Sequence, residues 1–437
     1  MEKLLQQACK KVDSAELFKV KSKTIPVNFE VSRLKSIDIS ESEGKALRVI
    51  NKGKIGFSSS TGSEGFDLLV EKAVATSEFG SEASFNFPEE VKRSGKKKIG
   101  IYDKKVVDKS IEEMVKVGEE IVKRLKDFNR KLRCDVTILK DYSEVECLNS
   151  RGGNFSYNKT TIAYSMMVQK IENQDMLMIY SSLESGKDNL NAEELTSEII
   201  ESLKWGDKIV PIESGKMPVI FTPKAVLVLI LPIISGLNGK MVLKKISPLA
   251  SQKNKKLWSD LLTIYSDGTI SFALGSAPFD DEGVEMKRIP LVKKGKIKNF
   301  YYDLQTAGIV GIKSTGNGLR TSSQSEPVPG ISNLVMREGE VSFKEMIKDI
   351  SEGIVIDQVL GLGQGNIISG AFSNNVQLGY KIGKGKIVGR VKDVMIAGNA
   401  IEELKNIVAL GDKAKWISGK YKFPHIYLKS LSVSAKK

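Results

Sequence analysis

Apolar and polar residues alternate along the first part of the chain. Val27, Phe29 and Val31 are separated by polar residues, and this period of two is typical of a strand with one buried face. The alternation predicts an antiparallel meander over 25–57. Its further strands are predicted at 34–39 and 46–50, and its turns at 40–44 and 51–54.

A period near 3.6 residues predicts helices around this meander. Residues 1–18 mix apolar and charged side chains at helical spacing, which indicates a surface helix, and a second helix is predicted over 65–79. Two more helix starts are marked by capping-box pairs, Ser110 with Glu113 and Asn191 with Glu194. Between these two helices, strands are predicted at 134–139, 144–148 and 155–182, the last of which folds back at 172–175.

From about residue 214 glycine becomes frequent and short β-type runs dominate. The runs lie at 218–221, 263–265, 289–292, 300–304 and 377–382, and a hairpin is predicted at 382–387. Two helices interrupt the strands. Ser342 with Glu345 caps one that stops at Gly353, and Asn399 with Glu402 caps one that stops at Gly411.

Helices mixed with antiparallel strands, without a regular strand–helix–strand alternation, predict an α+β fold. We expect a mixed N-terminal half with antiparallel sheets and a β-rich C-terminal half with a few helices. Residues 86–98 break the periodicity and indicate a linker. The expected units are therefore an α+β unit at 1–90, a second at 100–210 with a long β-ribbon flanked by helices, and a β-rich domain at 214–437.

The composition is that of a globular protein and restricts its chemistry. Of 437 residues, 41% are hydrophobic, and 67 basic against 53 acidic side chains give a net charge of +14. His425 is the only histidine, so this chain cannot form a zinc site with two histidines. Three cysteines are too few for a disulfide framework and predict a reducing compartment. Two of them, Cys134 and Cys147, lie in β-type runs and are expected to be buried and unreactive.

The sequence predicts a cytoplasmic protein without membrane contact. No secretory signal opens the chain. The longest apolar run, 225–234, has ten residues and contains Pro232, whereas a membrane-spanning helix needs about 20. We expect this run to be a buried element.

Positive charge gathers in three short runs, at 92–98, 253–256 and 293–298. They consist mostly of lysine, with Arg93 as their only arginine and no interleaved aromatic residue. Solvated loops are therefore favoured over a nucleic-acid interface.

Three consecutive acidic residues, Asp280, Asp281 and Glu282, are the first candidates for chemistry. Their oxygens could bind a hard cation, but adjacent strand positions point to opposite faces, so only two carboxylates could converge. A turn that hydrogen-bonds its own backbone is favoured. The glycine-rich segments 308–318 and 361–365 lack the Gly-Lys-Ser/Thr of a phosphate-binding loop and predict tight turns.

His425 is the only histidine that could serve as the base of a serine or cysteine hydrolase. It follows Pro424 in a predicted strand, and no Gly-x-Ser-x-Gly elbow accompanies it. A structural histidine is favoured over nucleophilic catalysis.

Several strings in the C-terminal half strongly resemble the TldD/PmbA family. They are FDDEGV at 279–284, STGN at 314–317, SNL at 332–334, SFKEMI at 342–347, GNIISGAFSNN at 365–375, GYKIGKGKIVGRVKD at 379–393 and IAGN at 396–399. Weaker agreement comes from VNFEVSRLKSI at 27–37 and GKALRVINKGKIGFSSST at 44–61. Together they cover nearly the whole chain. The resemblance implies paired cytoplasmic proteins, described as modulators of DNA gyrase and as a metalloprotease.

Proteolytic members of this family hold zinc through a His-Glu-x-x-x-His helix motif, followed by Gly-Leu-x-Gly, and through a later cysteine. The glycine pattern matches residues 236–239. Counting back places Ile230, Leu231 and Ser235 where His, Glu and His would stand. Aliphatic side chains cannot bind zinc, serine binds it poorly, and the late cysteine is missing. The chain thus resembles the TldE/PmbA branch, which lacks the zinc motif.

This resemblance implies a partner of a zinc-bearing, TldD-like subunit in an assembly that degrades or trims peptides. The chain itself would then have no catalytic residue, metal ligand or cofactor, and Ile230 with Leu231 would fill the former metal pocket. Its peptide-binding residues are unknown, although an extended peptide could add to a sheet edge. Two alternatives stay open: a homo-oligomeric peptide-binding protein without the partner, and a nucleic-acid or gyrase-associated modulator.

Overall fold

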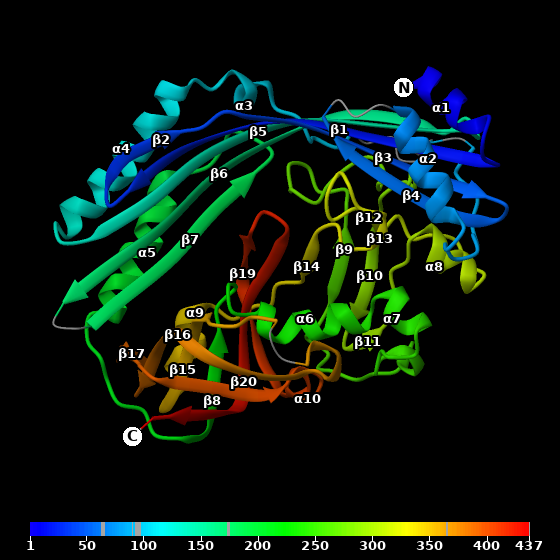
Figure 1. Cartoon of the computed structure of the whole chain (residues 1–437). Coiled ribbons are helices and arrows are strands. Elements are labelled where there is room, and N and C mark those ends of the chain that lie inside the picture. Colours follow the sequence, from blue (N-terminus) through cyan, green and yellow to red (C-terminus); the bar gives the residue numbers. More distant parts are fainter. Residues whose placement is uncertain (63–65, 90, 92–97, 173–174, 364–365, 437) are drawn as a thin grey trace.

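The chain folds into two large β-sheets with helices around them. The computed structural model describes residues 1–62, 66–89, 91, 98–172, 175–363 and 366–436. Figure 1 shows the long first sheet arching over the second half of the chain. The N-terminus lies beside the first sheet and the C-terminus beside the second.

The first sheet has seven antiparallel strands in the order β4-β3-β1-β5-β6-β7, and β2 pairs with the end of β1. The strands are β1 (Ser14–Glu30), β2 (Arg33–Ile37), β3 (Ser40–Asn51), β4 (Lys54–Thr61), β5 (Arg133–Asn149), β6 (Asn154–Glu172) and β7 (Asp175–Ser185). The helices of this half are α1 (Glu2–Cys9), α2 (Phe66–Ser77), α3 (Lys104–Asp108), α4 (Ile111–Phe128) and α5 (Ala192–Gly206). Strand β1 lies inside this sheet, between β3 and β5, and pairs with both.

Local signals placed most of these elements correctly. The capping box of Ser110 and Glu113 starts α4, and Asn191 caps α5 by accepting from the amides of Glu193 and Glu194. The predicted turn at 51–54 joins β3 to β4, with Lys52 in the left-handed region. Within the predicted linker 86–98, residues 90 and 92–97 lie outside the described residues.

Three predictions in this half are wrong. The helix predicted over 1–18 ends at Cys9, because β1 begins at Ser14, which pairs with Ile50 of β3, and β5 joins from Glu16 onward. The turn predicted at 40–44 is part of β3, paired residue by residue with β1. The strands predicted at 134–139 and 144–148 form one strand, β5, because β1 and β6 pair along its whole middle. Pairing with strands that are distant in the sequence decides each case, and a local stretch of sequence does not show that pairing.

The second sheet has eleven strands. They are β8 (Gly215–Phe221), β9 (Ile264–Asp267), β10 (Arg288–Lys293), β11 (Lys296–Ile297), β14 (Leu334–Met336), β15 (Glu352–Val359), β16 (Ala371–Gly383), β17 (Lys386–Arg390), β18 (Val394–Asn399), β19 (Ile407–Ile417) and β20 (Tyr421–Ala435). Strand β8 pairs with both β15 and β20, so β8, β15, β16, β18 and β20 form a closed ring. A small separate pair is formed by β12 (Gly318–Leu319) and β13 (Val328–Pro329).

Short helices complete the second half. They are α6 (Leu227–Gly236), α7 (Gly239–Leu243), α8 (Leu304–Ile309), α9 (Phe343–Lys348) and α10 (Ala400–Glu403), with 3₁₀ turns at Ala250–Gln252, Ile367–Ser369 and Leu404–Asn406. The capping box of Ser342 and Glu345 is confirmed at α9. Mixed helices and largely antiparallel sheets confirm the predicted α+β class.

Three predictions in the second half are wrong. The helix capped by Ser342 ends at Lys348 rather than at Gly353, because Glu352 already begins β15. Residues 300–304 form no strand: Asp303 instead caps α8 by accepting from the amide of Thr306. The helix capped by Asn399 ends well before Gly411, because Ile407 already pairs with β20 as the start of β19. At the two helix ends, pairing with a distant strand takes the backbone that the local pattern assigned to the helix. At 300–304 the reason is local, because the cap of Asp303 starts a helix there.

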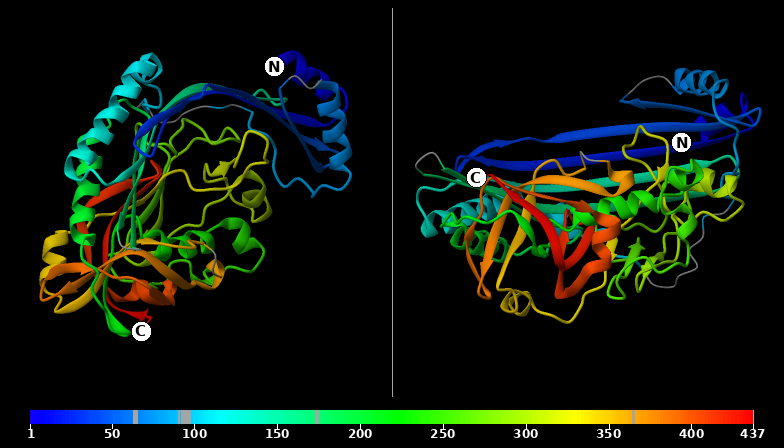
Figure 2. Two further views of the ribbon diagram at one scale, coloured as in Figure 1. Left: turned by 60° about the vertical axis from the view of Figure 1, so that its left-hand side comes forward. Right: turned by 90° about the horizontal axis from the view of Figure 1, so that it is seen from below.

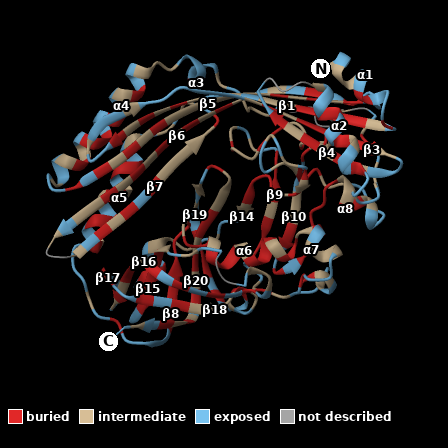
Figure 3. Cartoon of the chain, viewed as in Figure 1, coloured by how far each residue is buried: buried red, intermediate tan, exposed pale blue. Residues whose placement is uncertain are grey.

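The predicted buried run at 225–234 is confirmed as a core helix. Helix α6 lies among the strands of the second half, and Figure 3 colours most of it as buried. Within the described part of the chain, no helix is both long and apolar enough to cross a bilayer.

Candidate functional site

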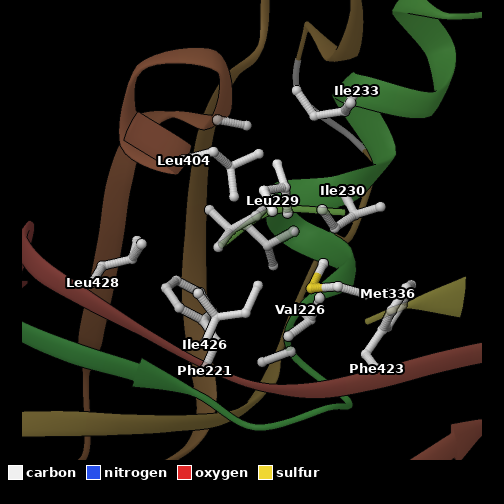
Figure 4. Packing of buried hydrophobic residues seen from close by; sticks show 14 of the residues in the cluster. Phe221, Val226, Leu229, Ile230, Ile233, Met336, Leu404, Phe423, Ile426 and Leu428 are labelled. Atoms are coloured by element: carbon white, nitrogen blue, oxygen red, sulfur yellow. The ribbon is translucent and has the colours of Figure 1, made fainter. Parts of the chain in front are cut away.

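Helix α6 carries the three positions where the family's zinc motif would stand. Ile230 is completely buried, and Figure 4 shows it packed among Val226, Leu229, Ile233 and Met336 in a hydrophobic core. Its carbon atoms have no lone pair to offer a metal, so this position does not fit zinc.

The other two positions do not fit a metal either. Leu231 is half-buried and packs against the same core, and Ser235 is half-buried one turn further along α6. Among the described residues, no group of three His, Cys, Asp or Glu side chains is placed to hold a metal ion. The residues present on α6 therefore cannot supply a zinc site.

The glycine pattern after α6 has a structural role. The amide of Gly239 donates to the carbonyl of Tyr301 at 2.9 Å, and a Cβ on Gly239 would lie 2.2 Å from the ring of Tyr302. The preceding residue, Asn238, caps α7, because its side chain accepts a hydrogen bond from the amide of Lys240. A side chain at Gly239 would separate α7 from these aromatic residues, so the glycine at this position serves packing.

The predicted turn at Asp280–Glu282 is confirmed, and the three carboxylates serve the backbone. Asp280 accepts from the amides of Val284 at 2.8 Å and Gly318 at 2.9 Å. Asp281 accepts from the amide of Arg320 at 2.7 Å. Burial raises the pKa of Asp280 and of Asp281 above its usual range. These side chains hold loops of the second half together.

Glu282 links this turn to the first sheet through buried ion pairs. Its Oε1 lies 2.6 Å from Nη1 of Arg48 on β3, and Nη2 of Arg48 lies 3.1 Å from Oε2 of Glu16 on β1. Nη2 of Arg320 lies 3.0 Å from Oε1 of the same Glu16. We call Glu16, Arg48, Glu282 and Arg320 the ion clasp. Burial raises the pKa of Glu282 to about 7, and the guanidinium of Arg48 opposes that shift.

A cavity of about 630 Å³ lies between the two halves. It is lined by the end of β7, one side of α5, the loop before α6, and β19 with the start of β20. Figures 1 and 2 both place the hairpin of β19 and β20 beside β7 and α5. Cavities between two structural layers are common ligand sites, so this is the candidate binding site.

Four charged side chains form a network on the cavity wall. Nζ of Lys224 lies 2.7 Å from Oε1 of Glu198 and 3.8 Å from Oδ2 of Asp357. Nζ of Lys415 lies 2.7 Å from Oε2 of Glu198. The two ammonium groups and two carboxylates balance, and they tie α5, the loop before α6, β15 and β19 into one wall.

Replacing Glu198 with glutamine should lower the free energy of unfolding near neutral pH and have less effect in acid. Burial alone would raise the pKa of Glu198 from 4.5, but Lys224 and Lys415 outweigh burial and lower it to about 2. An acid whose pKa falls on folding stabilises the protein above its unfolded pKa and loses that effect as the pH falls through its folded pKa. Near pH 7, Glu198→Gln should therefore lose about 2–3 kcal/mol, and the difference from wild type should shrink between about pH 4.5 and pH 2.

Urea unfolding across this pH range measures the effect. Glu30→Gln is the matched control, because Glu30 is exposed and forms no ion pair with a described residue. A stability difference for Glu198→Gln that does not change with pH would contradict the assignment.

His425 lies in strand β20, as predicted, and faces this cavity. Its ring stacks on Phe343 with centroids 4.5 Å apart. Burial lowers its pKa to about 4, so the imidazole is neutral at pH 7. Its aromatic contact is the ring of Phe343. That His425 is structural rather than catalytic stays a prediction.

The remaining sequence candidates are placed as follows. Cys134 and Cys147 are buried, and burial raises the pKa of both thiols, which agrees with the expected inert thiols. Residues 92–97 of the first lysine run lie outside the described residues. The runs at 253–256 and 293–298 meet, since Lys256 pairs with Lys296, and their lysines are mostly exposed on loops.

Sequence reasoning singled out Glu282 and His425 but missed the other residues of the ion clasp and the charged residues of the cavity wall. Glu198, Lys224, Asp357 and Lys415 come from four distant segments without a shared local motif. The clasp left one usable signal: Glu16 stands between apolar residues, where an unpaired charge would be costly.

The geometry agrees with comparisons with known proteins. Residues 214–435 match the PmbA/TldA metallopeptidase C-terminal domain, and residues 15–77 match the PmbA/TldA metallopeptidase domain 1. These matches define an α+β protein built from PmbA/TldA-type domains, in which helix α6 carries no His, Cys, Asp or Glu. The chain belongs to the PmbA/TldD family.

Relatives of three kinds resemble this chain. It is 35% identical to a metalloprotease TldD homologue of Buchnera aphidicola over 184 residues. This alignment covers 42% of this chain and 38% of that protein. It is 26% identical to a metalloprotease of Archaeoglobus fulgidus over 90% of both chains. TldE from Thermococcus kodakarensis shares the fold, with a TM-score of 0.92 at 22% identity over 100% of both chains. The Buchnera alignment spans about two fifths of that relative's length.

Proposed function

We propose that this chain is the non-catalytic subunit of a cytoplasmic, two-component metalloprotease that processes peptides. A TldD-like subunit would supply the zinc and the catalytic residues. The observation that carries this proposal is the burial of Ile230 in the α6 core, where the family's zinc motif would place a histidine. The similarity to metalloprotease TldD homologues and to a TldE structure supports the same pairing.

The peptide chain would be bound between the two halves. Strand β7 is the last strand of its sheet, so its outer edge has no strand partner among the described residues. Residues 181–185 of β7 and 414–417 of β19 both line the cavity. Backbone groups at a sheet edge accept an extended peptide with little dependence on sequence.

Peptidase assays of the chain alone and with a TldD-like partner test this proposal. The isolated chain should hold no stoichiometric zinc and hydrolyse no peptide, whereas the mixture should show hydrolysis that a chelator abolishes. The partner alone is the control, and native mass measurement separates a hetero-oligomer from self-association. Chelator-sensitive hydrolysis by the isolated chain would overturn the proposal, and so would a mixture no more active than the partner alone.

A further inference from the structure

The cavity between the halves has more negative than positive charge after its ion pairs are counted. Glu198 and Asp357 are balanced by Lys224 and Lys415. Three more carboxylates line the cavity, those of Glu184, Glu194 and Glu201, and none of them forms a salt bridge with a described residue. Lys187 is the one remaining lysine among the lining residues described.

Glu184 is the carboxylate of this set that lies inside the cavity. It is half-buried, whereas Glu194 and Glu201 are exposed on α5. Its Oε1 accepts a hydrogen bond from the hydroxyl of Ser182 at 3.2 Å. Burial raises the pKa of Glu184, since no cation offsets the loss of water around it. A positively charged ligand would supply the missing counter-charge.

The β19–β20 turn packs closely beside Glu184. Gly419 has a φ of +57°, and a Cβ on it would lie 3.1 Å from Cβ of Glu184 and 2.5 Å from Cγ of Leu274. A larger residue would push into this corner of the cavity. The glycine therefore keeps the turn close to β7 while the carboxylate stays accessible from the cavity.

Aromatic side chains complete the cavity wall. Trp205, Phe272 and Trp416 line the same cavity, on α5, on the loop after β9 and on β19. Lys187 forms a cation–π contact of this kind, with its Nζ 5.7 Å from the centroid of the Phe272 ring. Aromatic faces attract ammonium and guanidinium groups, and this attraction is independent of the carboxylates.

We propose that this cavity is a subsite for a cationic group of a peptide, an ammonium or guanidinium, with Glu184 as its counter-ion and the aromatic wall around it. That the cation belongs to a peptide rests on the proposed function. The charge and shape of the subsite follow from the lining residues alone. The preference would favour peptide segments that carry lysine or arginine at one position, while the sheet edges bind the rest of the backbone without selecting its sequence.

Binding to the isolated full-length chain tests this subsite without any partner or peptidase assay. The probes are an alanine pentapeptide with a central lysine, blocked at both ends, and its isostere with norleucine at the centre. Calorimetry should show the lysine peptide binding roughly tenfold or more tightly than the isostere, because only the lysine peptide forms a charge-assisted contact with Glu184. Added salt should weaken the lysine peptide more than the isostere.

Two variants locate the effect. Glu184→Gln keeps the shape of the side chain and should remove most of the preference for the lysine peptide. Glu30→Gln, a remote exposed site, should leave it unchanged. Equal affinities for the two peptides in the wild-type chain would overturn the subsite, as would an unchanged preference in Glu184→Gln. Either result would leave the peptidase test of the proposed function unaffected.

Discussion

Replacing Arg48 with alanine should lower the free energy of unfolding by about 3–5 kcal/mol, measured at pH 8, where Glu282 is ionised. Arg48 joins Glu16 and Glu282, and the three side chains are 4%, 0% and 0% exposed. Removing the guanidinium leaves two carboxylates in the interior without their shared cation. Because Glu282 belongs to the second half and Arg48 to the first sheet, the variant should also loosen the contact between the halves.

Urea unfolding of Arg48→Ala measures this loss. Lys45→Ala is the matched control, since Lys45 lies on the same strand and pairs with Glu43 at 2.9 Å, with side chains 25% and 27% exposed. Such an accessible pair contributes about 0–1 kcal/mol. Equal losses in the two variants would show that the ion clasp does not stabilise the fold as proposed.

Restoring one zinc-motif histidine by Ile230→His should destabilise the chain by at least about 3 kcal/mol and create no zinc site. The substitution replaces a fully buried aliphatic side chain with an imidazole that has no hydrogen-bond partner in this apolar core. Burying such an unpaired polar group costs about 2–7 kcal/mol. Leu231 and Ser235 would still not bind the metal with it.

Thermal unfolding and metal analysis check both parts of this prediction. Ile246→His is the control, because Ile246 is 45% exposed and the same change there should stay within about 0.5 kcal/mol of wild type. Stoichiometric zinc in Ile230→His, or unchanged stability, would mean that position 230 is not part of a closed apolar core.

Some errors in predicting the fold had a common cause. Residues 14–18 satisfy a helical period and a strand period equally well, and the pairing of β1 with β3 and β5 selects the strand. Gly411 suggested a helix end, yet its neighbours pair with β20 as part of β19. Long-range pairing overrides weak local preferences, because each ladder satisfies many backbone groups at once.

The sequence by itself determined what depends on near neighbours or on which atoms are present. The capping boxes at Ser110 and Ser342 each need only two residues three positions apart. A chain with one histidine cannot form a zinc site that needs two. Tertiary structure alone decided which charges meet. Arg48 and Glu282 are 234 residues apart, and the cavity wall draws on four separate segments. Charged side chains carry no local periodicity that reveals their partners, so only the folded backbone could bring them together.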